Sequence, residues 1–166
     1  MKSNKDRYIK FCQTERSIDI FSMPWWLDTV CESGNWNVAI VYDGNQIIAT
    51  MPYFFRKIIN YKIITMPKLT QTLGPWIRDY NKYDLNKNLS KYKLIIQALI
   101  DQIPKNHYFY QQMSTQFSNW LPFYWNNYQQ TTRYTYVIQN INREDIFLNF
   151  SQNKKRNIKK ALDFVD

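Results

Sequence analysis

The sequence predicts an α+β layered fold in which a mostly antiparallel central sheet is flanked by helices, and three observations predict it. Apolar runs flank Asp43-Gly44-Asn45, a hairpin pattern, because glycine readily adopts the positive φ of a tight turn. Leu89 to Ile103 repeats its apolar residues at helical spacing. With 45% hydrophobic residues and only 3 glycines among 166 residues, the composition is typical of one packed domain.

The first predicted elements are helical. Residues up to Ser17 are polar with scattered apolar positions, which is typical of a short helix or a lead-in segment. Ser22 is a suitable N-cap, and Pro24 fits the first turn of a helix from Met23 to about Glu32. We expect its buried side to consist of Trp25, Trp26, Leu27 and Val30.

A three-stranded meander is predicted next. Its strands are Trp36–Tyr42, Gln46–Phe55 and Tyr61–Met66, with Arg56 and Lys57 at or near the second turn. The two successive hairpins make the sheet mostly antiparallel, because strands joined by tight turns run in opposite directions.

Helices and strands alternate in the second half. Pro104 ends the helix that begins at Leu89. The remaining predicted elements are a strand over Tyr108–Met113, a helix over Phe117–Trp125 interrupted at Pro122, a strand over Thr131–Gln139, a helix over Arg143–Phe150 capped by Asn142, and a final helix capped by Ser151. Residues 1–140 are expected to form one lobe, and residues 141–166 to begin a helical connection to a second lobe.

The charge balance favours anionic partners. Lys and Arg number 22 against 13 Asp and Glu, a net charge of +9, with the densest cluster at Lys154-Lys155-Arg156. Compositional drift toward lysine is the alternative source of this excess. Cys12 and Cys31 have no metal-ligand spacing, and two buried free thiols are favoured over a disulfide. No targeting signal or apolar run of membrane-spanning length is visible, so we expect a cytoplasmic protein without a membrane span.

Self-contained catalysis has little support in the residues. His107 is the only histidine, so no histidine-based metal cluster can form and no metal site is expected. Its place beside Asn106, at the start of a predicted strand, favours a structural or exposed histidine over a catalytic one. Neither phosphate-binding glycine motif is present. We therefore nominate no catalytic residue.

The segment from Pro67 to Tyr80 combines loop-forming residues with groups suited to binding. Pro67, Gly74 and Pro75 exclude continuous regular structure, and the segment follows a strand, where functional loops often lie. Its candidate groups are Lys68, Thr70, Gln71, Thr72 and Trp76. The alternative is an ordered connection in which Trp76 only fills the core.

Several motifs in order along the chain resemble a known family. They are Phe21-x-x-Pro24-x-Trp26-Leu27, Trp36 opening a strand, Ala49-x-x-Pro52-Tyr53, Pro67-x-Leu69-Thr70-Gln71-x-x-Gly74-Pro75-Trp76, and Arg156-Asn157-Ile158-Lys159-Lys160-Ala161 after the strand around Tyr134 to Ile138. Together they resemble the N-terminal lobe of the FemAB-like and BioF2-like acyltransferases, which consist of two GNAT-like domains in tandem.

The resemblance implies transfer of an acyl or aminoacyl group from a carrier to an amine. The carrier would be acyl-coenzyme A or aminoacyl-tRNA. GNAT domains hold the carrier pyrophosphate on a Q/R-x-x-G-x-G/A turn, and Gln71-Thr72-Leu73-Gly74-Pro75 matches only its first part. We therefore expect no cofactor on this lobe, a C-terminal GNAT lobe as its partner, and little activity of the lobe alone.

Two functions are consistent with the sequence. As an acyltransferase lobe, the chain would place its substrate-binding candidates in one cleft: Lys68, Thr70, Gln71, Trp76, Arg156, Lys159 and Lys160. As a non-catalytic basic module, it would bind nucleic acid or another anionic partner through lysines and tyrosines. In either case Ile158, Ala161, Leu162, Phe164 and Val165 form an apolar stripe, which we expect to meet a partner chain, including a second copy, or to be poorly ordered.

Overall fold

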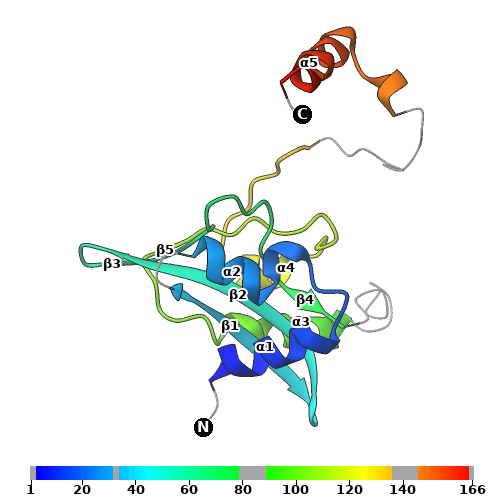
Figure 1. The fold of residues 1–166 in the computed structure, drawn as a ribbon. Coiled ribbons are helices and arrows are strands. Elements are labelled where there is room, and N and C mark those ends of the chain that lie inside the picture. The colour runs from blue at the N-terminus through cyan, green and yellow to red at the C-terminus, as the bar shows by residue number, and fades with distance from the viewer. Residues whose placement is uncertain (1–2, 32–33, 79–88, 136–145, 165–166) are drawn as a thin grey trace. The chain divides into compact units, whose positions relative to one another are not determined.

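The computed structural model describes residues 3–31, 34–78, 89–135 and 146–164. The chain consists of two compact units, Met1–Gln130 and Thr131–Asp166, each described by itself (Figure 1). This division falls before the boundary at residue 140 that the sequence predicts.

The first unit is built on a five-stranded sheet. Its strands are β1 (Trp36–Asp43), β2 (Gln46–Ile58), β3 (Tyr61–Thr65), β4 (Trp76–Ile77) and β5 (Tyr108–Phe109). The order is β1-β2-β3-β5, and β4 pairs separately with β2. Only the β3–β5 pair is parallel. The prediction of a mostly antiparallel sheet in an α+β fold is thus confirmed for the described residues.

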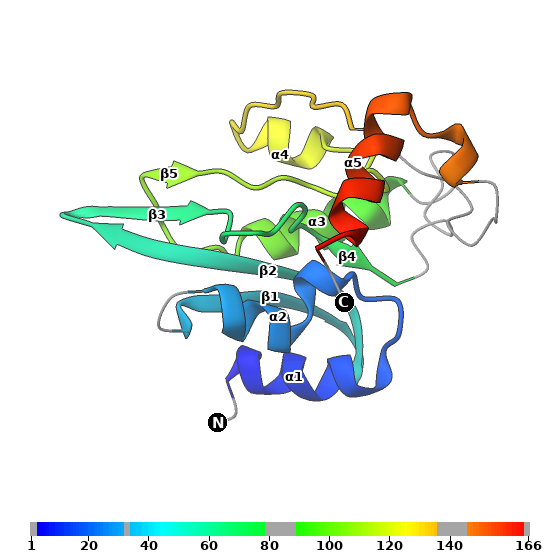
Figure 2. The same ribbon diagram turned by 45° about the horizontal axis from the view of Figure 1, so that its top comes forward.

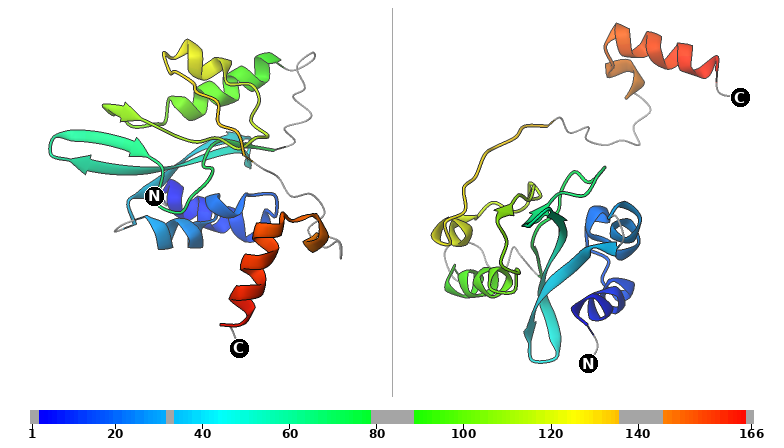
Figure 3. Two further views of the ribbon diagram at one scale, coloured as in Figure 1. Left: turned by 90° about the horizontal axis from the view of Figure 1, so that it is seen from above. Right: turned by 90° about the vertical axis from the view of Figure 1, so that its left-hand side faces the viewer.

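Helices cover both faces of this sheet (Figures 1 and 3). Helices α1 (Asn4–Thr14) and α2 (Pro24–Val30) lie on one face, and α3 (Leu89–Ile100) and α4 (Leu121–Trp125) on the other. Figure 2 shows the same layers from another direction. No helix of the described ranges is long and apolar enough to cross a bilayer.

Each face of the sheet has its own core, because successive strand residues point to opposite faces. The buried cluster under α1 and α2 contains Tyr8, Cys12, Ile18, Leu27, Cys31, Trp36, Val38, Ile40, Phe54 and Leu73. The buried cluster under α3 and α4 contains Ala39, Ile48, Ala49, Met51, Ile77, Tyr92, Ile95, Ile96, Leu99, Ile100 and Phe123. Cys12 and Cys31 are buried free thiols, as the sequence predicts.

The start of α2 differs from its prediction. Ser22 does not cap this helix: it ends a 3-10 turn, η1 (Ile20–Ser22), which Asp19 caps by accepting a hydrogen bond from Phe21 N. Ser22 is buried instead, and its carbonyl oxygen accepts a hydrogen bond from the Tyr8 hydroxyl at 2.9 Å. Met23 occupies the N-cap position of α2 without a side-chain hydrogen bond.

Two further predictions about the first unit are wrong in detail, those for Trp25 and Pro122, and the position of Arg56 and Lys57 near the second turn is made more exact. Trp25 is 55% exposed and lies outside the buried side of α2. Arg56 and Lys57 lie within β2, which continues to Ile58. Pro122 does not interrupt a helix but stands in the first turn of α4, where its missing N–H costs nothing.

The described residues of the second unit before its last helix, 131–135 and 146–151, contain little regular structure. Residues 131–135 form no strand, which corrects that part of the strand predicted over Thr131–Gln139; its remainder and the Asn142 cap lie outside the described residues. A 3-10 turn, η4 (Phe147–Asn149), stands at the end of the predicted helix over Arg143–Phe150. Helix α5 (Gln152–Leu162) follows, and Ser151 caps it by accepting from Lys154 N, as predicted.

Candidate functional site

The sheet of the first unit splits along one edge of β2. On this edge Phe54 pairs with Thr65 of β3, whereas Thr50 pairs with Trp76 of β4. On this edge, opposite the one that pairs with β1, no described strand pairs with β2 between these two points. Pro52 lies in the middle of the split, and its missing N–H leaves no donor unpaired there. The segment 66–75, which connects β3 to β4, therefore leaves and rejoins β2 around this position.

Residues just after β5 contact both sides of the split. Gln111 Nε2 donates a hydrogen bond to the Pro52 carbonyl oxygen at 2.6 Å, and Leu73 N donates to the Gln112 carbonyl oxygen at 2.7 Å. Gly74 approaches Met113 so closely that a Cβ there would lie 3.3 Å from Met113 Cγ. A side chain at this position would require Met113 to shift by a few tenths of an ångström.

The Gln111 side chain has an unused acceptor. Its Oε1 atom is buried and has no hydrogen-bond partner among the described residues. Burying an amide oxygen without a partner is costly. Gln111 Oε1 is therefore an acceptor that an N–H donor reaching it could satisfy. Gln111 was not among the sequence candidates, since only its tertiary position distinguishes it from the other glutamines.

The loop candidates are held to different extents. Thr70 is half-buried, and its hydroxyl accepts from the Trp26 indole N–H at 3.0 Å and donates to the Lys68 carbonyl oxygen at 3.1 Å. The side chains of Lys68 and Gln71 are exposed. Leu69, between them in the turn, has φ 57° and is 84% exposed. The Trp26 contact thus fixes the loop to α2 while its tip faces solvent.

Trp76 belongs to a tightly bonded structural network. Its indole N–H donates to Ser17 Oγ at 3.0 Å, and its ring packs edge-on against Phe11 with centroids 5.3 Å apart. The Arg78 guanidinium lies 5.4 Å from the Trp76 ring centroid and donates from Nε to the Ile47 carbonyl oxygen at 3.1 Å. These contacts match the alternative in which Trp76 fills the core between α1 and the sheet.

Glu15 completes this network. Its Oε2 lies 3.2 Å from Arg78 Nη2, and its Oε1 accepts a hydrogen bond from the Ser17 hydroxyl at 2.7 Å. Burial on its own raises the pKa of Glu15, but the Ser17 hydrogen bonds and the Arg78 charge outweigh it, so the pKa is lowered. Ser17, Glu15 and Arg78 were not sequence candidates, because Arg78 is far from the other two in the chain and meets them only in the folded unit.

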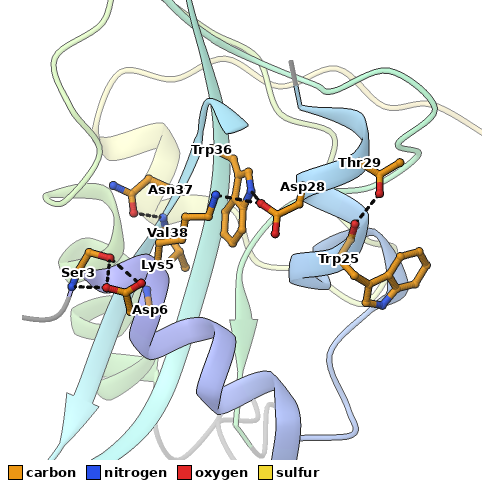
Figure 4. A network of polar contacts seen from close by, with 9 residues as sticks. All are labelled: Ser3, Lys5, Asp6, Trp25, Asp28, Thr29, Trp36, Asn37 and Val38. Carbon is orange, nitrogen blue, oxygen red and sulfur yellow. Dashed lines mark hydrogen bonds and ion pairs between the residues drawn. The ribbon is translucent and has the colours of Figure 1, made fainter. Parts of the chain in front are cut away.

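A second polar network joins α1, α2 and β1 (Figure 4). Asp28 Oδ1 accepts from the Trp36 indole N–H at 2.8 Å and from Lys5 Nζ at 3.0 Å. Lys5 Nζ also lies 4.2 Å from the Trp36 ring centroid. Burial opposes ionisation of Asp28, but the Trp36 and Lys5 hydrogen bonds lower its pKa. This network fixes the helices to the sheet.

His107 has a structural position at the edge of the sheet. Its imidazole Nδ1 accepts a hydrogen bond from the backbone N–H of Lys62 at 3.1 Å. The backbone N–H of His107 in turn donates to the Lys62 carbonyl oxygen at 2.8 Å. The described residues contain no group of three His, Cys, Asp or Glu side chains that could hold a metal ion.

The remaining candidates belong to the second unit. Arg156, Lys159 and Lys160 are exposed on α5, and Arg156 Nη2 donates to Asn153 Oδ1 at 2.6 Å. Lys155 instead donates to the Leu148 carbonyl oxygen at 2.7 Å, which ties α5 to the preceding turn. Lys68, Thr70 and Gln71 lie on the loop before β4, whereas Trp76 begins β4 and packs toward α1. A single cleft containing all seven candidates stays a prediction.

Comparisons with known proteins leave the chain unassigned. No family model and no curated protein matches it. Among solved structures, a crystal structure of a mutant Bacillus halodurans protein from the Northeast Structural Genomics Consortium matches with a TM-score of 0.34 and 11% identity, over 82% of this chain and 87% of that chain. Similarity at that level assigns neither family nor function.

Proposed function

We propose that the chain is a GNAT-like lobe of an acyl- or aminoacyl-transferase and that its contribution is to bind the amine acceptor. The sequence motifs around Trp26, Pro52 and the Pro67–Trp76 loop motivate the family. The observation that supports a binding role is the split beside Pro52, where the buried Gln111 Oε1 has no partner among the described residues.

The chemistry suits an extended, amide-bearing acceptor. A segment that enters the split would donate one amide N–H to Gln111 Oε1, as an added strand donates to a sheet edge. The exposed loop tip with Lys68 and Gln71 would contact the rest of the molecule. In the transfer step the acceptor amine nitrogen attacks the carrier carbonyl carbon. A C–N bond forms, the carrier C–S or C–O bond breaks, and a proton passes from nitrogen to the carrier sulfur or oxygen.

Binding of a defined probe tests this function. The probe is an Nα-acetylated, lysine-containing tripeptide amide, added to ¹⁵N-labelled protein. We expect shifts in the Gln111 side-chain amide and Leu73 backbone amide resonances, and about fivefold weaker binding for Gln111→Leu, the effect of one hydrogen bond. Gln116→Leu, an exposed site in the same segment, should leave affinity unchanged. Saturating probe without shifts at the split would refute acceptor binding here.

Transfer itself is assayed separately. The probe is incubated with the protein and either acetyl-coenzyme A or alanyl-tRNA, and the probe mass is measured. A mass increase that requires Gln111 supports the transferase. Binding without transfer by any donor would leave an acceptor-binding lobe that needs its partner lobe, and addition of that lobe should then restore transfer.

A second candidate function is binding of nucleic acid. It is favoured by the exposed cations Arg156, Lys159 and Lys160, which form no ion pair with a described residue. Phosphate contacts make affinity fall steeply with salt. If Lys159→Gln/Lys160→Gln reduces both the affinity for a random single-stranded RNA and the slope of log affinity against log salt, the cations contact phosphate. An unchanged slope would exclude that role.

A further inference from the structure

The hairpin formed by the ends of β2 and β3 has an unusual surface. Residues 55–63, here called the arm, project beyond the other strands in Figures 1 and 2. At the tip, Ile58, Ile59 and Tyr61 are 44%, 82% and 58% exposed. A two-residue turn does not require these apolar side chains. A cluster of exposed apolar side chains often marks an interaction surface.

The backbone conformation at the tip of the arm is also unusual. Ile59 has φ 55° in the first position of the Ile59–Asn60 turn. Glycine is the usual residue at such a position, and a β-branched residue there is strained. The strain brings no packing in return within the molecule, because the Ile59 side chain is almost fully exposed. A partner that covered this side chain would bury apolar surface that the fold itself leaves exposed.

The charges on the arm indicate the chemistry of a partner that would cover it. Lys57 pairs directly with Lys62 across the ladder, and Arg56 precedes them on β2. Like charges placed opposite one another destabilise a sheet. These three cations form no ion pair with a described residue, and residues 44–78 contain no Asp or Glu at all. The covering partner must therefore be both apolar at the tip and anionic beside it.

We propose that the arm docks on an anionic lipid surface. Ile58 and Ile59 enter the boundary between headgroups and acyl chains, Tyr61 lies at that boundary, and Arg56, Lys57 and Lys62 contact lipid phosphates. This combination of an apolar end and neighbouring cations is the one that peripheral membrane binding requires. Nucleic acid fits less well, because an aliphatic tip offers no ring for base stacking. The proposal does not depend on the acyltransferase function.

Vesicle co-sedimentation of the full chain tests the proposal. The probes are phosphatidylcholine vesicles and vesicles of equal parts phosphatidylcholine and phosphatidylglycerol. Binding should be confined to the anionic vesicles. Lys57→Gln/Lys62→Gln should lower the partition coefficient by roughly fivefold per cation removed. Ile59→Asn should lower it as well while keeping the fold, since asparagine tolerates positive φ.

Matched controls separate the arm from other surfaces. Leu94→Asn removes a similarly exposed apolar residue from α3, and Lys159→Gln/Lys160→Gln removes two cations from α5; both should retain arm-dependent vesicle binding. The proposal is overturned if neutral vesicles bind equally, if the arm variants bind like the unmodified protein, or if only the α5 variant loses binding. It is also overturned if the arm variants lose RNA binding while vesicle binding is unchanged.

Discussion

At the residue scale, burial controls the chemistry of the two cysteines. Desolvation raises the pKa of the Cys12 thiol to about 11 and that of Cys31 to about 12. A thiol with so high a pKa remains protonated near neutral pH, and the thiolate is the reactive form. Both residues are therefore expected to serve packing and not redox or nucleophilic chemistry.

This argument predicts slow alkylation of the native protein. In iodoacetamide at pH 8, Cys12 and Cys31 should remain unmodified over times in which free cysteine reacts completely, and both should react after denaturation. Mass spectrometry of each peptide gives the measurement. Rapid modification of either thiol in folded protein would mean that its surroundings open, and that burial does not protect it.

Glu15 gives the second prediction at this scale. The pKa of Glu15 is lower in the folded protein than in the unfolded chain, where it is about 4.3. The ion pair with Arg78 therefore stabilises the protein fully above that unfolded pKa. This stabilisation is lost as the pH falls through the lower pKa of the folded protein. Glu15→Gln should cost about 1 kcal/mol at pH 7 and flatten the decline of stability in acid. Urea unfolding at several pH values measures this. Asp43→Asn, in an exposed pair with Lys91, should change little.

At the element scale, a single cap supports α5. Ser151 accepts from Lys154 N, and none of the described residues of the helix is fully buried. With little packing to support it, the helix depends on its local signals. Ser151→Ala should cost about 1 kcal/mol of helix stability and reduce helical chemical shifts over residues 152–162. Ser151→Asp retains an oxygen acceptor and should preserve those shifts; a loss of helicity in both variants would show that the hydroxyl is not acting as a cap.

At the scale of the whole molecule, the two units differ in how they are stabilised. The first unit contains both buried clusters, and the described part of the second unit has no buried residue. Residues 131–135, at the start of the second unit, are exposed and without regular structure. Brief trypsin treatment should therefore cut after Arg133 before it cuts after Arg56, which pairs with Ile63 in the β2–β3 ladder.

The fragment left by that cut should keep its fold. Mass spectrometry identifies the first cleavage, and circular dichroism of the purified fragment compares its melting with that of the full chain. We expect the fragment to melt cooperatively, with a temperature close to that of the parent. Earlier cleavage at Arg56, or loss of cooperative melting after cleavage at Arg133, would mean that the second unit is part of the stable core.

Local signals were sufficient for the elements that depend on local chemistry. Gly44 adopts φ 57° in the predicted hairpin turn, Pro24 begins α2, and Ser151 caps α5. The turns, caps and apolar periodicity that identify such elements lie within a few residues of one another. The α+β fold class and the antiparallel meander were accordingly predictable from the sequence.

Contacts between residues far apart in the sequence decided the features that local signals did not predict. Ser22 has the chemistry of an N-cap, but Tyr8 reaches its carbonyl and holds it in the core. The strand predicted from Thr131 does not form over residues 131–135, because an alternating pattern gains nothing without a sheet edge to pair with. Gln111 became a candidate only when β5 placed it beside Pro52. The sequence by itself determined which segments form helices and hairpins, whereas pairing between distant segments determined where the sheet opens and which polar atom is left without a partner there.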